Sequence, residues 1–146
     1  MNLILSELDI LLGDIMELII NGWIDRDFDY NIRISETRFD DCLAKKIMNY
    51  FDYQYIDEGL GEKKTVIENA NLRIWFSDEK CTLEEAQMNF DSFMETGELL
   101  TEGYYVGYSE WTITGFEIKE LRIGGHDLTR ELTNHIGQYA HLILTD

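Results

Sequence analysis

Acidic side chains dominate this chain, and their charge is the constraint that any fold of it must satisfy. The 146 residues include 29 Asp and Glu against 12 Lys and Arg, which gives a formal net charge of −17. Such a charge opposes compaction by self-repulsion and favours carboxylates at the surface or beside a cation. Because 45% of the residues are apolar and 12% aromatic, the chain still has material for a buried core and is not of the disordered class.

The charge is unevenly placed along the chain. Residues 81–118 contain eight acidic residues and neither lysine nor arginine, so this stretch has no cation of its own. Such a surface repels DNA, RNA and anionic lipid, which argues against direct binding to nucleic acid or membrane. No apolar run approaches the ~18–20 residues of a membrane span, and the first residues lack the basic start of a secretory signal. We therefore expect a cytoplasmic protein whose partner is positively charged.

Hydrophobic periodicity and turn residues predict an α+β fold. Apolar residues at helical spacing predict helices over residues 7–21, 37–51 and 82–97 and a short helix after Asp127. Alternating residues predict strands over residues 30–34, 53–55, 65–67, 72–76, 104–114, 116–123 and 139–144, the last of them central because it is almost wholly apolar. These elements predict a mainly antiparallel sheet of about five to six strands packed with three to four helices. We expect one domain over residues 1–146, with residues 1–52 as an alternative helical subregion.

The helix predicted over residues 82–97 places four carboxylates on one exposed face. A Thr82-x-x-Glu85 capping box marks its start and Gly97 its end. Offsets of 0, 7, 11 and 14 residues align the four side chains at spacings comparable to those of DNA phosphates. The members of this predicted stripe are Glu84, Asp91, Glu95 and Glu98. Such a row would suit a basic groove that otherwise holds nucleic acid, and the alternative is a solvated face without a partner.

Two further groups are candidates for the same contact. One is a cluster of acidic residues around the first predicted strand, Asp25, Asp27, Asp29, Asp40 and Asp41. The spacing from Asp25 to Glu36 also follows a calcium-binding EF-hand loop, although Tyr30 stands where that loop needs glycine. A calcium site is the less favoured alternative. The second group is aromatic and would supply a dry centre beside the acids, with Tyr104, Tyr108 and Trp111 as its members.

The sequence contains no motif typical of catalysis. His126, His135 and His141 have no metal-ligand spacing, and no nucleophile elbow, phosphate loop or dinucleotide fingerprint occurs. Cys42 and Cys81 are typical of buried thiols, with a disulfide as the open alternative. The sequence therefore predicts a protein that is not an enzyme and needs neither a cofactor nor a metal.

Small size, strong acidity, the α+β pattern and the lack of a catalytic motif together resemble phage-encoded inhibitors of host defence, the anti-CRISPR proteins and anti-restriction DNA mimics. The resemblance is carried by residues 81–118 and by Asp25–Asp29. It implies a non-catalytic inhibitor in the cytoplasm of a host bacterium. Such an inhibitor occupies the nucleic-acid-binding cleft of a defence nuclease, a Cas effector or a restriction enzyme, and blocks DNA or guide RNA. The alternative is an acidic module of the immunity-protein or adaptor type that binds a basic host protein.

Overall fold

A computed structural model describes residues 16–51, 54–57, 62–89, 91–106 and 115–146. Its strands are β1 (Glu17–Arg26), β2 (Ile32–Ser35), β3 (Gln54–Asp57), β4 (Glu62–Ser77), β5 (Ser92–Val106), β6 (Gly115–Ile123), β7 (His126–Asp127) and β8 (Tyr139–Thr145). Its helices are α2 (Leu43–Tyr50), α3 (Leu83–Asn89) and α4 (Leu128–Thr133). None of these helices is long and apolar enough to cross a membrane.

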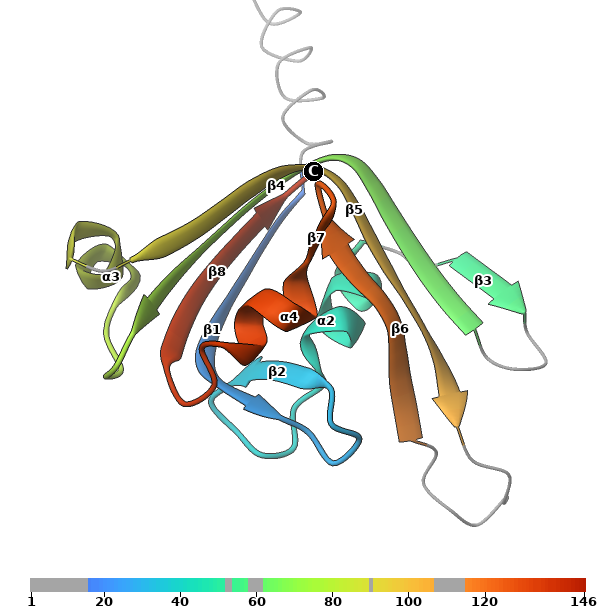
Figure 1. Cartoon of the computed structure of the whole chain (residues 1–146), viewed down its shortest axis with the longest axis horizontal. Helices are drawn as coiled ribbons and strands as arrows, with labels where there is room; N and C mark the ends of the chain where they lie inside the picture. The colour runs from blue at the N-terminus through green and yellow to red at the C-terminus, as the bar shows by residue number, and fades with distance from the viewer. Residues whose placement is uncertain (1–15, 52–53, 58–61, 90, 107–114) are drawn as a thin grey trace, which may run out of the picture.

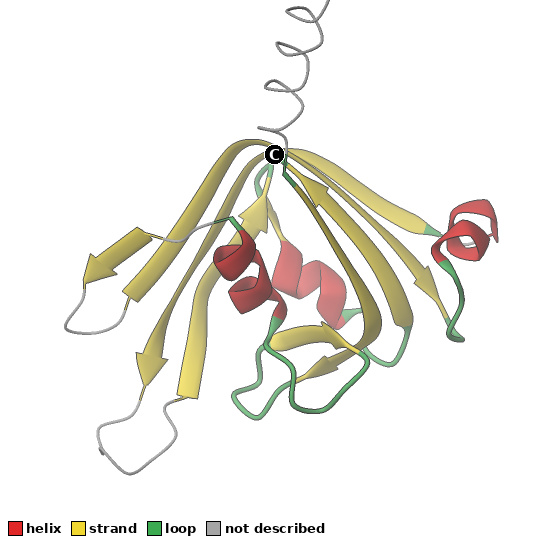
Figure 2. Cartoon of the chain, turned by 180° about the vertical axis from the view of Figure 1, so that it is seen from behind, coloured by secondary structure: helices red, strands yellow, loops and turns green. Residues whose placement is uncertain are grey.

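The described strands form one antiparallel sheet that curls into a half-barrel. Along the sheet the order is β2-β1-β8-β4-β5-β6-β7, and β3 pairs with β4 off this path. The strands converge near the C-terminus and spread into two arms (Figure 1). Helices α2 and α4 lie between the arms, whereas α3 stands at the end of one arm, as both views show (Figures 1 and 2). The predicted class, α+β with a mainly antiparallel sheet, is confirmed.

The core lies on the concave side of the sheet, under α2 and α4. Strand β8 is central, between β1 and β4, as its apolar sequence predicts. Its Ala140, Leu142 and Leu144 are fully buried and alternate with residues that point to the opposite face of the sheet. The helices add the fully buried side chains of Leu43, Ile47, Leu128 and Leu132. Burial of each such leucine or isoleucine contributes about 1.5–3 kcal/mol, so these short helices are held by packing more than by helix propensity.

The helix predicted over residues 7–21 is wrong where the structure describes it. Residues 17–21 belong to β1 and pair with β8 from Glu17 with Thr145 to Trp23 with Tyr139, and residues 1–15 lie outside the described residues. A short apolar run is compatible with both helical and strand spacing. Here the hydrogen-bonded ladder with β8 makes the run a strand. The alternative of a helical subregion over residues 1–52 is also wrong, because β1 and β2 are part of the common sheet.

The helix predicted over residues 82–97 is also too long. Helix α3 ends at Asn89, and β5 begins at Ser92. Strand β5 pairs with β4 from Trp75–Ser92 to Lys63–Gly103, and this long ladder overrides the local helical spacing. Strand β4 is in turn one strand with a bulge between Ile67 and Ala70, where the sequence predicted two. The predicted capping box is confirmed, since Thr82 Oγ1 accepts from the N–H of Glu85 at 3.2 Å.

Helix α2 is shorter than predicted, and α4 agrees with its prediction. Helix α2 begins at Leu43, not near Thr37, because Ser35 Oγ bonds to both the N–H and the carbonyl of Thr37 and to Asp40. Helix α4 begins as predicted after Asp127, whose side chain accepts from the N–H of Arg130. Both cysteines are free, Cys42 in the core and Cys81 half-buried. Burial raises the pKa of the Cys42 thiol to about 11.

Side chains, not a strand ladder, close the half-barrel between its β2 and β6 edges. Asn31, which is 8% exposed, donates from Nδ2 to the carbonyl of Phe116 at 2.5 Å and accepts at Oδ1 from the N–H of Ile118 at 3.3 Å. Asp29 Oδ2 accepts from the N–H of Phe116 at 3.1 Å. Asp27 Oδ1 accepts from the N–H groups of Asp29 and Asn31, which fixes the turn that carries both. We call Asp27, Asp29 and Asn31 the clasp.

Replacing Asn31 by alanine tests the clasp. Asn31→Ala leaves the carbonyl of Phe116 and the N–H of Ile118 without their partner, so we expect a loss of about 2–4 kcal/mol in the free energy of unfolding. Asn49→Ala is the matched control, because Asn49 is exposed on α2 and its loss should change stability by less than about 0.5 kcal/mol. Urea denaturation followed by circular dichroism measures both, and equal stability of the two variants would contradict a closing role for Asn31.

Candidate functional site

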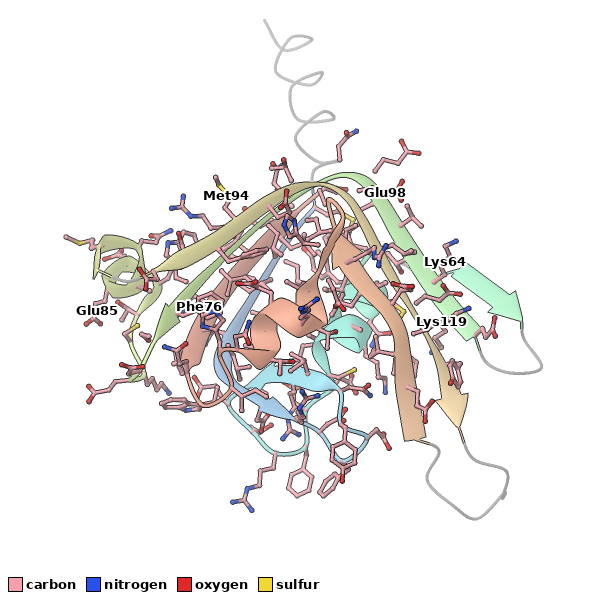
Figure 3. All side chains as sticks on the ribbon, in the orientation of Figure 1. Lys64, Phe76, Glu85, Met94, Glu98 and Lys119 are labelled. Carbon is pink, nitrogen blue, oxygen red and sulfur yellow. The ribbon has the colours of Figure 1, made fainter. Side chains whose placement is uncertain are left out.

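The four carboxylates predicted to share one helix face do not lie on one helix. Glu84 is exposed on α3 and Asp91 follows the end of that helix, while Glu95 and Glu98 belong to β5. Glu95 Oε2 lies 2.5 Å from His126 Nδ1 and is half-buried. Figure 3 shows Glu98 near the convergence of the strands, well away from α3. The predicted row on one rigid helix is therefore wrong. Three of its members, Glu84, Asp91 and Glu98, are exposed at the surface.

Most of the acidic residues around the β1–β2 turn are engaged within the chain. Asp27 and Asp29 belong to the clasp. The other three form ion pairs: Asp25 with Arg33 at 2.7 Å, Asp41 with Lys45 at 3.2 Å, and Asp40 with Lys46. Burial alone would raise the pKa of Asp40, but the hydrogen bond and charge of Lys46 lower it, so Asp40 is ionised at neutral pH. A partner contact at these five residues stays a prediction, and the cations beside them reduce the charge that they present.

The calcium alternative has little structural basis in this turn. Asp25, the first residue of the loop pattern, holds the guanidinium of Arg33 by two hydrogen bonds of 2.8 and 2.7 Å. The residues that follow the turn form β2, where an EF-hand needs its second helix. Among the described residues, no group of three or more His, Cys, Asp or Glu side chains could hold a metal ion.

Of the three predicted aromatic contacts, the structure describes one. Tyr104 is half-buried in β5, and its hydroxyl donates to Glu117 Oε2 at 2.7 Å. This bond fixes the ring against β6 at the surface. Tyr108 and Trp111 lie outside the described residues, so their contact role stays a prediction.

Exposed carboxylates are concentrated in the connection between β4 and β5. We call residues 78–91 the acidic connection. It contains Asp78, Glu79, Glu84, Glu85 and Asp91, and its one cation is Lys80. Lys80 Nζ lies 3.3 Å from Glu36 Oε2, so this cation already has a carboxylate partner outside the connection. The connection therefore presents an excess of negative charge on one end of the molecule.

Three carboxylates of the connection and a pair of stacked rings surround a cavity of about 470 Å³. Its lining residues are Phe76, Ser77, Asp78, Glu79, Asp91, His135 and Gln138. The buried ring of Phe76 stacks on His135 with ring centroids 3.6 Å apart and an angle of 6° between the planes. Asp78, Glu79 and Asp91 are exposed at the cavity. We call this cavity the acidic pocket.

Hydrogen bonds from three parts of the chain fix the walls of the acidic pocket. The N–H of Phe76 donates to the carbonyl of Asp91 at 3.1 Å and so joins the end of β4 to the last residue of the acidic connection. Gln138 Nε2 donates to Asp78 Oδ1 at 3.0 Å, and Gln138 Oε1 lies 2.6 Å from His135 Nδ1. The pocket is therefore preformed, with a polar mouth and an aromatic wall.

Exposed carboxylates beside stacked rings are chemically complementary to a cationic group. Carboxylates at the mouth attract an ammonium or guanidinium group, and flat rings accommodate the apolar stem of a lysine or arginine side chain. Of these lining residues Asp91 was predicted from the sequence. Phe76, His135 and Gln138 were not, because they come from β4 and from the segment between α4 and β8. No signal in the sequence joins these segments, since only the ladder between β4 and β8 brings them together.

No family model, curated protein or solved structure matches this chain. Its function has therefore to be argued from the geometry of its own residues.

The carboxylate that binds Lys80 makes the fold sensitive to acid. The hydrogen bond from the Tyr139 hydroxyl, followed by Lys80, lowers the pKa of Glu36 below its ordinary value of 4.5. A lowered pKa contributes stability that is present above pH 4.5 and is lost as the pH falls through the folded-state pKa. Tyr139→Phe removes the hydroxyl, so wild type should exceed the variant in melting temperature at pH 7, and the difference should shrink between pH 5 and pH 3. A difference that does not change with pH would contradict this coupling.

Proposed function

We propose that this protein acts by binding a basic protein partner, with the acidic connection as its contact surface and the acidic pocket as the receptor for one lysine or arginine side chain. The observation that carries the proposal is the concentration of five carboxylates in residues 78–91. Three of them line a preformed cavity with an aromatic wall. This is the immunity-protein or adaptor type of function among the two expected from the sequence.

The distribution of charge supports this choice over nucleic-acid imitation by a regular row. The carboxylates of the predicted stripe are divided between α3 and β5 and do not repeat at phosphate spacing on one axis. A pocket for one side chain provides specific recognition of a protein surface, because a partner without a cation at that point leaves the carboxylates unmatched. The electrostatic field of the whole chain, with a net charge of −17, accelerates its association with a basic surface.

A second candidate is an inhibitor of a host-defence nuclease, and one observation favours it. Strand β5 and α3 contain no lysine or arginine, and their exposed acidic residues extend from the acidic connection to Glu98, with Arg73 of β4 opposite Met94 as a neighbouring cation. The seven residue steps from Asp91 to Glu98 span about 23 Å, which is long enough to cover part of a nucleic-acid cleft. In this case the partner is a Cas effector or a restriction enzyme. The bound inhibitor prevents DNA or guide RNA from entering the nucleic-acid cleft of that partner.

Neutralising the pocket carboxylates tests the proposed function. Partners that co-purify at low salt are identified by mass spectrometry, and the affinity of the purified partner is measured by interferometry. Glu79→Gln with Asp91→Asn should weaken binding at least about tenfold, mainly through the association rate, because both carboxylates face the cavity. The matched control is Glu68→Gln with Glu117→Gln, which changes the net charge equally at exposed positions elsewhere.

The control pair should lower affinity only about two- to threefold, since distant surface charges are screened by salt. Equal losses for the two pairs would show that net charge alone acts and would contradict a role for the pocket. A recovered nuclease whose cleavage of DNA stops when the chain is bound would favour the second candidate. A basic partner without nuclease activity would favour the first.

A further inference from the structure

Residues 17–22 of β1 have a described strand neighbour on only one side. Strand β1 pairs with β8 from Glu17 to Trp23, but with β2 only from Trp23 to Arg26. At Gly22 the backbone of Ser35 comes so close that a Cβ atom would lie 2.3 Å from its carbonyl carbon. Strand β2 ends there, and on its side residues 17–22 of β1 face no described strand.

The register shows which backbone groups point toward this open edge. The N–H of Ile24 donates to the carbonyl of Gln138, and the carbonyl of Ile24 accepts from the N–H of Gly137, both at 2.9 Å. Successive residues of an antiparallel strand bond to opposite sides, so the even-numbered residues bond toward β8. Ile19 and Asn21 then direct their N–H and carbonyl groups to the open side. Within the described residues, no partner occupies these groups on that side.

A contact from α2 supports this assignment. The Tyr50 hydroxyl donates to the carbonyl of Glu17 at 2.5 Å, as expected if odd-numbered residues face away from β8. Helix α2 therefore lies beside the open edge. Between them is a cavity of about 540 Å³, lined by residues 18–21 of β1 and by Asp41, Lys46, Asn49 and Tyr50. We call this cavity the edge groove, and its volume is within the range of about 300–1,000 Å³ of ligand sites.

Two other edges among the described strands are covered in part by side chains. The β2 edge is covered where Lys46 Nζ donates to the carbonyl of Ile34 at 2.9 Å. The β6 edge receives Asp29 and Asn31 of the clasp. Proteins protect such edges because exposed N–H and carbonyl groups pair with any extended chain. An edge left open beside a helix is the arrangement to which a peptide strand is added in other folds.

We propose that an extended peptide segment of a basic partner adds to β1 as a strand in the edge groove and pairs with Ile19 and Asn21. Alternate side chains of the peptide face Leu18 and Ile20 on one side of the sheet, where apolar residues fit. The others lie beside Ile19, which is 53% exposed, and favour lysine or arginine in the field of a chain with net charge −17. The basic character of the peptide rests on the proposed function, whereas the strand addition rests on the edge itself.

The charged groups of the edge groove do not oppose this occupant. Lys46 is paired with Asp40, and Asp41 is paired with Lys45. A basic peptide therefore meets no unpaired cation among the described lining residues. A second copy of the chain is a poorer occupant, because it brings another 17 negative charges to the same place.

Amide hydrogen exchange of the full chain, labelled with ¹⁵N, tests the proposal. In the free protein the N–H groups of Ile19 and Asn21 should exchange at least tenfold faster than those of Leu18 and Ile20. The probe is an acetylated and amidated octapeptide of alternating lysine and valine. Its addition should slow exchange at Ile19 and Asn21 at least tenfold, and the same peptide with N-methyl groups on alternate amides should not.

A pair of variants at one position separates the backbone from the side chain. Ile19→Pro deletes the N–H on the open side, where a strand edge tolerates proline, and should weaken binding of the probe at least tenfold. Ile19→Ala retains the N–H and should bind within about threefold of wild type. The N-methylated peptide gives the same information without any change to the protein, should Ile19→Pro fail to fold.

Each outcome supports or overturns the strand addition separately from the proposed function. Slow exchange of Ile19 and Asn21 in the free chain would show the edge already covered by its own chain or by a second copy, and would overturn the proposal. Equal binding of the two peptides would show attraction by charge alone and would also overturn it, while the comparison of pocket and control variants would still decide the proposed function. If Glu79→Gln with Asp91→Asn leaves the basic partner bound, the proposed function fails, and the exchange result at β1 stands unaffected.

Discussion

The clasp between the β1–β2 turn and β6 is the interaction on which the rest of the structure depends. A curled sheet of this kind has two edges that approach each other without forming a ladder, and their polar groups need partners. The amide of Asn31 supplies both a donor and an acceptor to β6, and the carboxylate of Asp29 supplies a second acceptor. The half-barrel is thereby held around α2 and α4 at that end, and the acidic turn has a structural role.

The acidic residues of the β1–β2 turn and those of the acidic connection differ in how far their charge is compensated. Around the β1–β2 turn the carboxylates bond to backbone amides or to Arg33, Lys45 and Lys46. In the acidic connection the one lysine is bound to Glu36, and no other cation of the connection is available to the carboxylates. The acidic connection therefore concentrates negative charge at one end of the molecule, beside the acidic pocket. A local charge of this kind favours a localised contact over a uniformly acidic coat.

The fold class and several elements followed from the sequence because their signals are local. The capping box at Thr82, the cap at Asp127 and the apolar run of β8 each depend on a few adjacent residues. The errors arose where pairing with a distant strand outweighed local spacing. Residues 17–21 and 92–97 have helical periodicity, yet the ladders with β8 and β4 place them in strands.

The candidate site was predictable only in part, for the same reason. The lack of cations in residues 81–118 pointed to the correct part of the chain, although the rigid row inferred there does not exist. Phe76, His135 and Gln138 enter the acidic pocket through the pairing of β4 with β8, which no single segment encodes. The open edge of β1 could likewise not be predicted from the sequence, because it depends on where β2 ends.

The most direct test of this account is a map of where a small cation binds. Pentalysine is titrated into the ¹⁵N-labelled chain at low salt, and the shift of each backbone amide is followed. We expect the largest changes across the acidic connection and at His135 and Gln138, with small changes around Asp25, Asp29 and Asp40. Equal changes at both groups of carboxylates, or larger ones at the β1–β2 turn, would contradict the division of charge from which the function is inferred.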